Sequence, residues 1–255
     1  MKAMILAAGL GTRLKPITDS IPKALVEING VPILQHVILF LKGQGFNRLV
    51  VNVHHFADQI KEFLYSNDFG VEIIISDESE ALLDTGGGIV NAFPLLFKND
   101  NTPALIHNVD IISNASDLKK LINKTEETGS GASLLVSDRE SSRKLLFDPE
   151  MNLAGWHDLK NNQFKMTGNA NCLYKEYAFS GIYTISREAV EEMKKLFSTN
   201  RFSVMEYFLN PERKERIIGC EQEDLKLLDI GKPATLSQAS KLLSDLHSHG
   251  SGDFL

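Results

Sequence analysis

The residues best suited to chemistry stand near the start of the chain. The stretch Leu6-Ala7-Ala8-Gly9-Leu10-Gly11-Thr12-Arg13 is followed, a short way on, by Pro22-Lys23. Its glycines and alanines are small enough for backbone N–H groups to approach and converge on an anion. Arg13 adds a planar fork of donors suited to phosphate oxygens, and Lys23 adds a mobile positive charge. The pattern predicts a loop that grips a triphosphate from several sides.

Three other interpretations of this loop explain less. A dinucleotide-binding fingerprint needs a small residue where Leu14 stands and a helix that starts at once, but Pro16 and Pro22 interrupt such a helix. A P-loop must close on Gly-Lys-Ser/Thr, which Gly11-Thr12-Arg13 does not supply. A plain flexible turn would leave the arginine and the lysine without a purpose.

Two aspartates follow apolar runs that read as strands. Asp110 closes Asn108-Val109-Asp110, and Asp229 lies in Leu228-Asp229-Ile230-Gly231. In open α/β sheets ligands bind at the carboxyl ends of strands. Two carboxylates there would hold Mg²⁺ by one or two protein oxygens together with phosphates, as that ion prefers. Taken singly, an aspartate at a strand end more often caps a helix or forms a turn.

Further candidates lie where small or flat residues would admit a ligand. In Asp84-Thr85-Gly86-Gly87-Gly88, three consecutive glycines weaken a helix start unless a ligand must approach closely, whereas a helix cap needs only one small residue. Ser180 and Gly181 interrupt an expected strand, where close backbone approach is a usual cause. Trp156 could stack on a sugar ring or simply pack.

Gly9-Leu10-Gly11-Thr12-Arg13 followed by Pro22-Lys23 resembles the two-part signature of sugar-1-phosphate nucleotidylyltransferases. The resemblance implies that Arg13 binds the β- and γ-phosphates, that Lys23 binds the α-phosphate and the sugar phosphate, and that Asp110 and Asp229 hold Mg²⁺. It makes Arg13, Lys23 and Asp110 the catalytic residues. The nucleotide-binding residues it implies are Ala7, Ala8, Gly9, Gly11, Thr12, Arg13, Thr85, Gly86 and Gly87. Those implied for the sugar are Lys23, Trp156, Ser180 and Gly181.

Within that family, Leu83-Asp84-Thr85-Gly86-Gly87-Gly88-Ile89 and the pair His54-His55 are similar to the N-acetylmuramate-1-phosphate uridylyltransferases and guanylyltransferase-like relatives. The resemblance therefore implies transfer of a nucleoside monophosphate from an NTP to a sugar 1-phosphate, with release of pyrophosphate. UTP with N-acetylmuramate 1-phosphate is the expected pair. The resemblance is weak over residues 138–178, where the sugar would be recognised.

Other substrates and other classes stay open. The alternatives are GTP with mannose or heptose 1-phosphate, UTP or dTTP with glucose 1-phosphate, and cytidylyl transfer to phosphocholine. A glycosyltransferase is disfavoured because Asn108 stands where Asp-x-Asp needs its first aspartate. A non-catalytic nucleotide-sugar sensor would be expected to lose the aspartates or the lysine. Lys232 and Leu228 depart from the family pattern beside Asp229, which weakens that assignment relative to Asp110.

The elements that must position these residues alternate along the first half. Apolar runs predict strands, and amphipathic intervals predict helices. The expected strands cover residues 2–6, 48–53, 71–76, 103–107 and 132–137, and the helices 33–43, 57–66, 88–97 and 116–127. The alternation predicts an α/β fold with a Rossmann-like, mostly parallel mixed sheet and helices on both faces. By resemblance this is the nucleotide-diphospho-sugar transferase fold, similar to glycosyltransferase A.

After residue 137 short strands are expected at 144–148, 152–156 and 178–185, then helices at 187–197 and 233–247. They suggest a small antiparallel, sugar-binding part. We expect one catalytic domain over 1–247, with a nucleotide-binding half, 1–137, and a second half, 138–247, that carries the sugar site and the second metal ligand. Residues 248–255 are expected to form a flexible tail.

Composition limits the expected partners and the expected cellular compartment. The chain has 255 residues, 43% of them hydrophobic, and a formal net charge of −6, which argues against a nucleic-acid partner. No apolar run approaches the roughly 20 residues of a membrane span, and the start does not read as a signal peptide. The two cysteines, Cys172 and Cys220, favour a reducing compartment, so a cytoplasmic location is expected. A homodimer is expected only from the resemblance.

Overall fold

The computed structural model describes residues 1–98, 100–167 and 173–249. Cys172 and the last six residues of the expected tail lie outside the described residues. The chain divides into two compact units: unit 1 contains residues 1–82, 107–116 and 226–255, and unit 2 contains residues 83–106 and 117–225. The predicted functional halves, 1–137 and 138–247, stay a prediction.

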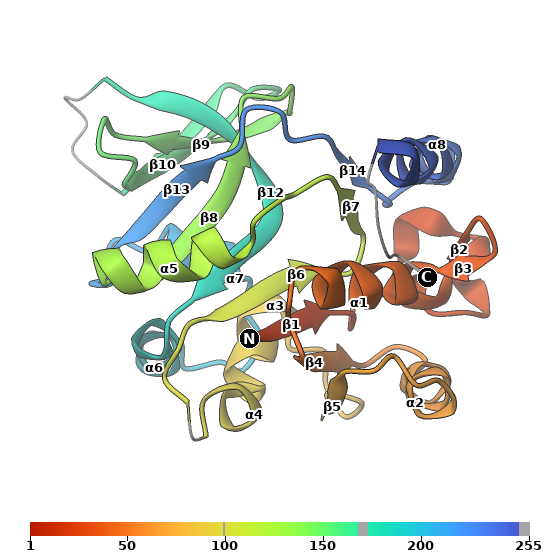
Figure 1. The fold of residues 1–255 in the computed structure, drawn as a ribbon. Coiled ribbons are helices and arrows are strands. Elements are labelled where there is room, and N and C mark those ends of the chain that lie inside the picture. Colours follow the sequence, from red (N-terminus) through yellow and green to blue (C-terminus); the bar gives the residue numbers. More distant parts are fainter. Residues whose placement is uncertain (99, 168–172, 250–255) are drawn as a thin grey trace. The chain divides into compact units, whose positions relative to one another are not determined.

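Unit 1 is built on three parallel strands in the order β1-β4-β5, namely β1 (Lys2–Leu6), β4 (Arg48–Val53) and β5 (Glu72–Asp77). Every residue of β1 is buried, as expected for a continuous apolar strand. The helices of this unit's first part are α1 (Ile33–Gly43) and α2 (Ala57–Ser66). The α2 helix packs against β4 and β5, and α1 buries the apolar stripe that its spacing predicted (Figure 1).

The remaining elements of unit 1 are short and bring distant parts of the sequence together. Strand β7 (Ile111–Ser113) pairs with β14 (Leu227–Asp229), and β2 (Glu27–Ile28) pairs with β3 (Val31–Pro32). The last helix, α8 (Pro233–His249), packs against β2, β7 and β14. Three single-turn 3-10 helices lie in the first 25 residues, at Thr12–Leu14, Ile17–Asp19 and Lys23–Leu25.

Unit 2 is mainly antiparallel. Its strands are β8 (Ala132–Ser137), β9 (Arg143–Phe147), β10 (Leu153–Asp158), β11 (Gln163–Met166), β12 (Lys175–Ile185) and β13 (Ile217–Glu221). Only β13, beside β8, is parallel to its partner among these described pairs. Strand β6 (Ala104–Asn108) begins in this unit, and its last two residues belong to unit 1.

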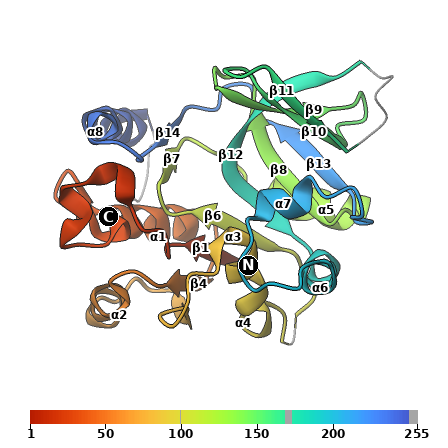
Figure 2. The ribbon, with the colours of Figure 1, turned by 180° about the vertical axis from the view of Figure 1, so that it is seen from behind.

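The helices of unit 2 are α3 (Asp84–Asn91), α4 (Phe93–Phe97), α5 (Lys119–Thr128), α6 (Arg187–Leu196) and α7 (Val204–Phe208). Helix α5 packs on β8 and β12, and α6 and α7 pack on α3, as the view from behind shows (Figure 2). In the described part of the chain, no helix combines the length and the apolar character needed to cross a membrane.

The predicted α/β fold with a mixed, mostly parallel sheet is confirmed, and the antiparallel part lies where it was expected, after residue 137. The predicted helix 88–97 was wrong in its bounds. It is two helices, α3 and α4, which start at Asp84 and part at Ala92. Pro94 cannot donate the N–H that a continuous helix would require. Strands β11 and β13 and helix α7 were not predicted.

Candidate functional site

The glycine loop of unit 1 runs directly out of β1 and closes in the first 3-10 helix. Gly11 adopts a left-handed φ of +64°, and a Cβ there would lie 3.0 Å from Thr18 Cγ2 and 3.1 Å from Lys23 Cβ. Its carbonyl accepts the Leu14 N–H at 2.9 Å and the Thr18 hydroxyl at 2.8 Å. Only glycine fits this position without strain. Gly9, Thr12 and Arg13 are exposed on the loop.

Two buried polar side chains behind the loop were missed from the sequence. The Ala7 N–H donates to Asn52 Oδ1 at 2.7 Å, and Asn52 Nδ2 donates to Glu78 Oε1 at 2.9 Å. Asn52 is 2% exposed and Glu78 3%. An asparagine inside the apolar run of β4 was the available signal, because a buried amide requires partners. The Ala7 amide is thus committed to Asn52, and a nucleotide contact of Ala7 stays a prediction.

Lys23 and Asp110 meet in unit 1. Lys23 follows Pro22 in the third 3-10 helix, and Asp110 lies in the turn between β6 and β7. The Lys23 ammonium donates to Asp110 Oδ2, and the side chains are 10% and 20% exposed. The sequence placed both residues in the site, and the structure brings them into direct contact. A charge pair this secluded leaves a costly unpaired charge if either partner is removed.

Arg13 and Asp229 form a second, more exposed pair. Arg13 Nη2 lies 3.8 Å from Asp229 Oδ2. Asp229 pairs with Ile111 across β14 and β7, and the Ile230 N–H donates to the Asp110 carbonyl at 2.8 Å. The two predicted metal ligands therefore come from adjoining chain segments of unit 1, although they are more than a hundred residues apart in sequence.

Gly231 leaves room for this second pair. A Cβ at position 231 would lie 2.7 Å from Asp229 Oδ1 and 2.8 Å from Arg13 Cζ. Such distances are shorter than any real carbon contact, so a larger residue would displace the guanidinium or the carboxylate. The glycine two positions after Asp229 thus leaves room for Arg13.

The glycine run of unit 2 is packed by the chain itself. The Gly86 and Gly87 N–H groups both donate to the Phe202 carbonyl, at 2.9 and 3.2 Å. A Cβ on Gly86 would lie 2.3 Å from the Phe202 ring, and one on Gly87 would lie 1.9 Å from the Asn200 carbonyl oxygen. Thr85 Oγ1 accepts the Val204 N–H at 2.8 Å. The close approach indicated by the glycines is that of residues 200–204, and contact of Thr85, Gly86 and Gly87 with a nucleotide stays a prediction.

The residues predicted to bind sugar all lie in unit 2, apart from Lys23. Gly181 has a φ of +79°, and the pairing of β12 with β8 shifts register between Phe179 and Tyr183. Ser180 is 1% exposed. Its hydroxyl donates to the Ile182 carbonyl and accepts the Ile182 N–H. Such bulges re-aim the chain, often beside active sites. Trp156 is half-buried in β10. Contact of Trp156, Ser180 and Gly181 with a sugar stays a prediction.

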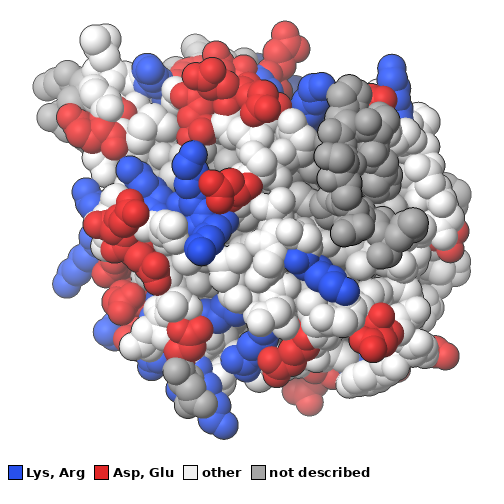
Figure 3. Space-filling model, viewed as in Figure 1, with Lys and Arg blue, Asp and Glu red and all other residues white. Residues whose placement is uncertain are grey.

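Charge on the visible face is mixed. In Figure 3 the lysines and arginines of that face lie among aspartates and glutamates.

In unit 1, close to the turn that holds Asp110, His107 is fully buried, and burial lowers its pKa to about 4. Its ring nitrogen Nδ1 bonds the Asn108 carbonyl at 2.8 Å. The imidazole is therefore neutral near pH 7 and adds no charge behind Asp110.

Known proteins resemble this chain in sequence and in fold. The N-acetylmuramate alpha-1-phosphate uridylyltransferase of Caulobacter vibrioides is 42% identical over 113 residues, which cover 43% of this chain and 46% of that protein. The mannose-1-phosphate guanyltransferase of Gibberella zeae is 40% identical over 114 residues, 44% of this chain and 31% of that protein. These matches span about half or less of the length of the relatives.

A solved structure, the inositol-1-phosphate CTP transferase from T. maritima, superposes with a TM-score of 0.76 at 19% identity and covers 98% of both chains. At that identity the likeness concerns the fold. A sequence model described as nucleotidyl transferase matches residues 2–145. That match spans more than half of the chain and includes the glycine loop, Lys23 and Asp110. The chain belongs to the nucleotidyl transferase family.

Proposed function

We propose that this chain transfers a nucleoside monophosphate from an NTP to a sugar 1-phosphate and releases pyrophosphate. The observation that carries the proposal is the pairing, inside unit 1, of Lys23 with Asp110 and of Arg13 with Asp229. Two cations suited to phosphates and two carboxylates suited to a divalent cation come together beside the glycine loop. The family match and the names of the relatives support the same reaction class.

The donor set of the two aspartates fits Mg²⁺. Their carboxylates are hard oxygen ligands, and Mg²⁺ is commonly held by one or two carboxylates with substrate phosphates and water supplying the rest. Among the described residues, no group of three or more His, Cys, Asp or Glu side chains is arranged to hold a metal. When bound, the ion would neutralise charge on the phosphates and fix their geometry.

In the proposed reaction an oxygen of the sugar phosphate attacks the α-phosphorus. A new P–O bond forms, the bond to the bridging oxygen of the β-phosphate breaks, and pyrophosphate leaves with its electron pair. The attacking oxygen is anionic near neutral pH, so no protein base is required. Lys23 aligns the attacking phosphate beside the α-phosphate, and Arg13 stabilises the leaving pyrophosphate. Positioning and charge neutralisation supply the catalysis.

The substrate pair we favour is UTP with N-acetylmuramate 1-phosphate, because the relative of that name is 42% identical over the matched region. GTP with mannose 1-phosphate is the second candidate, supported by a relative that is 40% identical. In either case the product is a nucleotide sugar. For the favoured pair it would be a cell-envelope precursor made in the cytoplasm.

Pyrophosphate release tests the proposal directly. Each NTP is combined with a panel of sugar 1-phosphates, with Mg²⁺ or with EDTA. We expect signal in one or two combinations, lost with EDTA. Asp110→Asn and Lys23→Ala should lower kcat by on the order of 10²- to 10³-fold. Lys61→Ala, which breaks the 2.6 Å pair with Asp77 elsewhere in unit 1, is the matched control and should stay active.

The outcomes separate the classes. A folded protein that binds a nucleotide sugar but releases no pyrophosphate in any combination would be a sensor, not a transferase. Signal that survives EDTA would remove the metal role of Asp110 and Asp229. Full activity in Asp110→Asn or Lys23→Ala would refute the assignment of those residues.

A further inference from the structure

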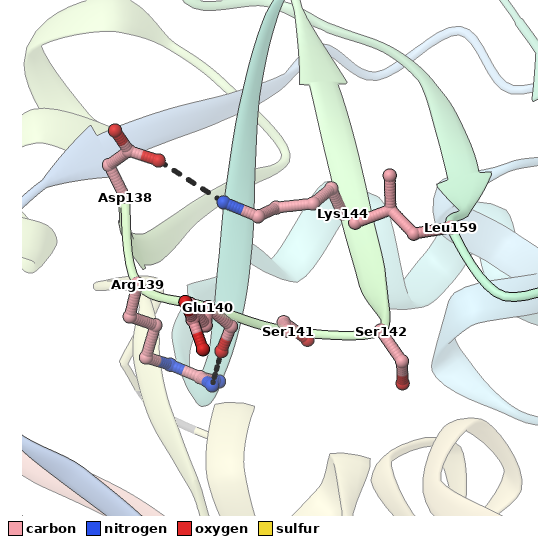
Figure 4. A pocket seen from close by; sticks show the side chains of 7 residues that line it. All are labelled: Asp138, Arg139, Glu140, Ser141, Ser142, Lys144 and Leu159. Carbon is pink, nitrogen blue, oxygen red and sulfur yellow. Dashed lines mark hydrogen bonds and ion pairs between the residues drawn. The ribbon is translucent and has the colours of Figure 1, made fainter.

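An open hollow of 570 Å³ lies in unit 2, on the loop between β8 and β9 (Figure 4). Its wall is made of charged, hydroxyl and apolar side chains: Asp138, Arg139, Glu140, Ser141, Ser142, Lys144 and Leu159. The Leu159 N–H donates to the Ser142 carbonyl at 3.0 Å, so two sides of the hollow are tied by backbone. None of these residues was among the predicted site residues.

The wall of the hollow is hydrogen-bonded to the segment predicted to bind the sugar. Arg139 Nη2 donates to the Phe179 carbonyl at 2.9 Å, and Phe179 directly precedes Ser180 and Gly181. Ser137, the last residue before the loop, pairs with Ala178 of β12. Within unit 2 the hollow is therefore next to the bulge of β12. A sugar held at that bulge would therefore lie near the hollow.

Lys144 is a fixed cation of the hollow, in addition to Arg139. Its side chain is only 11% exposed, and its Nζ lies 3.1 Å from Asp138 Oδ1, whose side chain is 78% exposed (Figure 4). The ammonium is thus held in place by its buried stem, whereas its carboxylate partner stands in solvent. An exposed carboxylate contributes little to such a pair and is easily replaced. Asp138 marks the place where a carboxylate of a ligand would fit.

We propose that this hollow binds the carboxylate of an acidic amino-sugar 1-phosphate, with Lys144 as its anchor and Asp138 as the group it displaces. The inference rests on the proposed transferase function and names its acceptor class. The serine hydroxyls suit polar substituents of the sugar, and Leu159, 46% exposed, offers an apolar surface to a methyl group. A neutral hexose phosphate would gain nothing from Lys144.

A matched pair of acceptors tests the carboxylate. N-acetylmuramate 1-phosphate and N-acetylglucosamine 1-phosphate differ only in the lactyl ether that bears the acid. With UTP, we expect the wild type to show the lower KM for the acidic sugar. Lys144→Met should raise that KM by on the order of 10- to 100-fold, the range for loss of a charged hydrogen bond. The kcat and the KM of the neutral sugar should not change.

Two variants distinguish binding from a structural role. Asp138→Asn removes the competing carboxylate and should lower the KM of the acidic sugar, opposite to the effect of Lys144→Met. Loss of a merely structural ion pair would move both variants in one direction, and for both sugars. Lys144→Arg keeps the charge and should retain part of the preference. Lys160→Met removes an exposed lysine beside Leu159 and should leave the preference unchanged.

The failures are distinguishable. Equal KM values for both sugars in the wild type, or parallel shifts in the two hollow variants, would overturn the inference while the transferase stands. Turnover of neutral hexose phosphates alone would do the same. If no acceptor releases pyrophosphate, calorimetry with the two amino-sugar phosphates decides: tighter binding of the acidic one, lost in Lys144→Met, supports the hollow, and equal binding refutes it.

Discussion

The network behind the glycine loop yields a prediction with a defined sign and an internal rescue. Asn52 accepts the Ala7 N–H and donates to Glu78 Oε1 at 2.9 Å, deep in unit 1. Asn52→Asp keeps the acceptor for Ala7 but replaces the donor with a second carboxylate oxygen. Two carboxylates would then face one another in a buried place, where the native amide no longer supplies a proton between them.

The size of the effect follows from the distance. At 2.9 Å and an effective dielectric constant of 20, two unit charges repel by about 6 kcal/mol. The pair avoids part of this repulsion by taking up a proton. Protonation costs about 4 kcal/mol at pH 7 for a carboxyl group whose ordinary pKa is about 3.9. We therefore expect a loss of about 4 kcal/mol in the free energy of unfolding. The folded variant binds the proton more tightly than the unfolded chain, so the deficit shrinks as pH falls towards about 4.

Glu78→Gln in the same chain should restore a hydrogen bond between positions 52 and 78, because the new amide can donate to the introduced carboxylate. Urea unfolding of the wild type, both single variants and the double variant gives the coupling between the two sites. The KM for the NTP should rise in Asn52→Asp and return in the double variant, since Ala7 leads into the loop. A loss below about 1 kcal/mol, or a double variant no more stable than Asn52→Asp, would refute the network.

Three further substitutions test packing and titration. Gly86→Ala places a Cβ 2.3 Å from the Phe202 ring and should cost about 1–3 kcal/mol of unfolding free energy in urea titrations. The wild type should lose up to about 3 kcal/mol of unfolding free energy as pH falls from about 6.5 towards 4, because the buried His107 ring stays neutral while the unfolded chain binds a proton. His107→Gln should remove this loss. Gly231→Ala crowds Arg13 at 2.8 Å and should raise the KM for the NTP while urea unfolding changes little.

The elements that the sequence predicted most accurately are those with strong periodicity. The bounds of β1, β4 and β8 and of helix α1 agree with the prediction, because continuous apolar runs and a regular helical stripe leave little choice. Strand β13 was missed. It is five residues long and takes its place only because β8, some eighty residues earlier in the chain, offers an edge. Local pattern carries no information about such a partner.

Helix α7 was missed although its signal is present in the sequence. It is only five residues long, too short for helical periodicity, but Ser203 and Glu206 form a capping box at its start. The glycine run of α3 shows the opposite limit. The glycines predicted the close approach of a ligand, which stays a prediction, and in the structure the groups that crowd Gly86 and Gly87 are the Phe202 ring and the Asn200 carbonyl, which no local pattern could name.

The charges of unit 1 would couple the binding of the triphosphate to that of the divalent cation. Each carboxylate predicted to hold a metal is paired with a cation predicted to hold a phosphate: Asp110 with Lys23, and Asp229 with Arg13. A triphosphate that draws the two cations to itself releases the two carboxylates, and a divalent cation that neutralises the carboxylates releases the cations. Each ligand thus prepares the site for the other, and such coupling is reciprocal by thermodynamic necessity. The secluded Lys23–Asp110 pair must carry most of this coupling, because screening by water already weakens the exposed pair of Arg13 and Asp229.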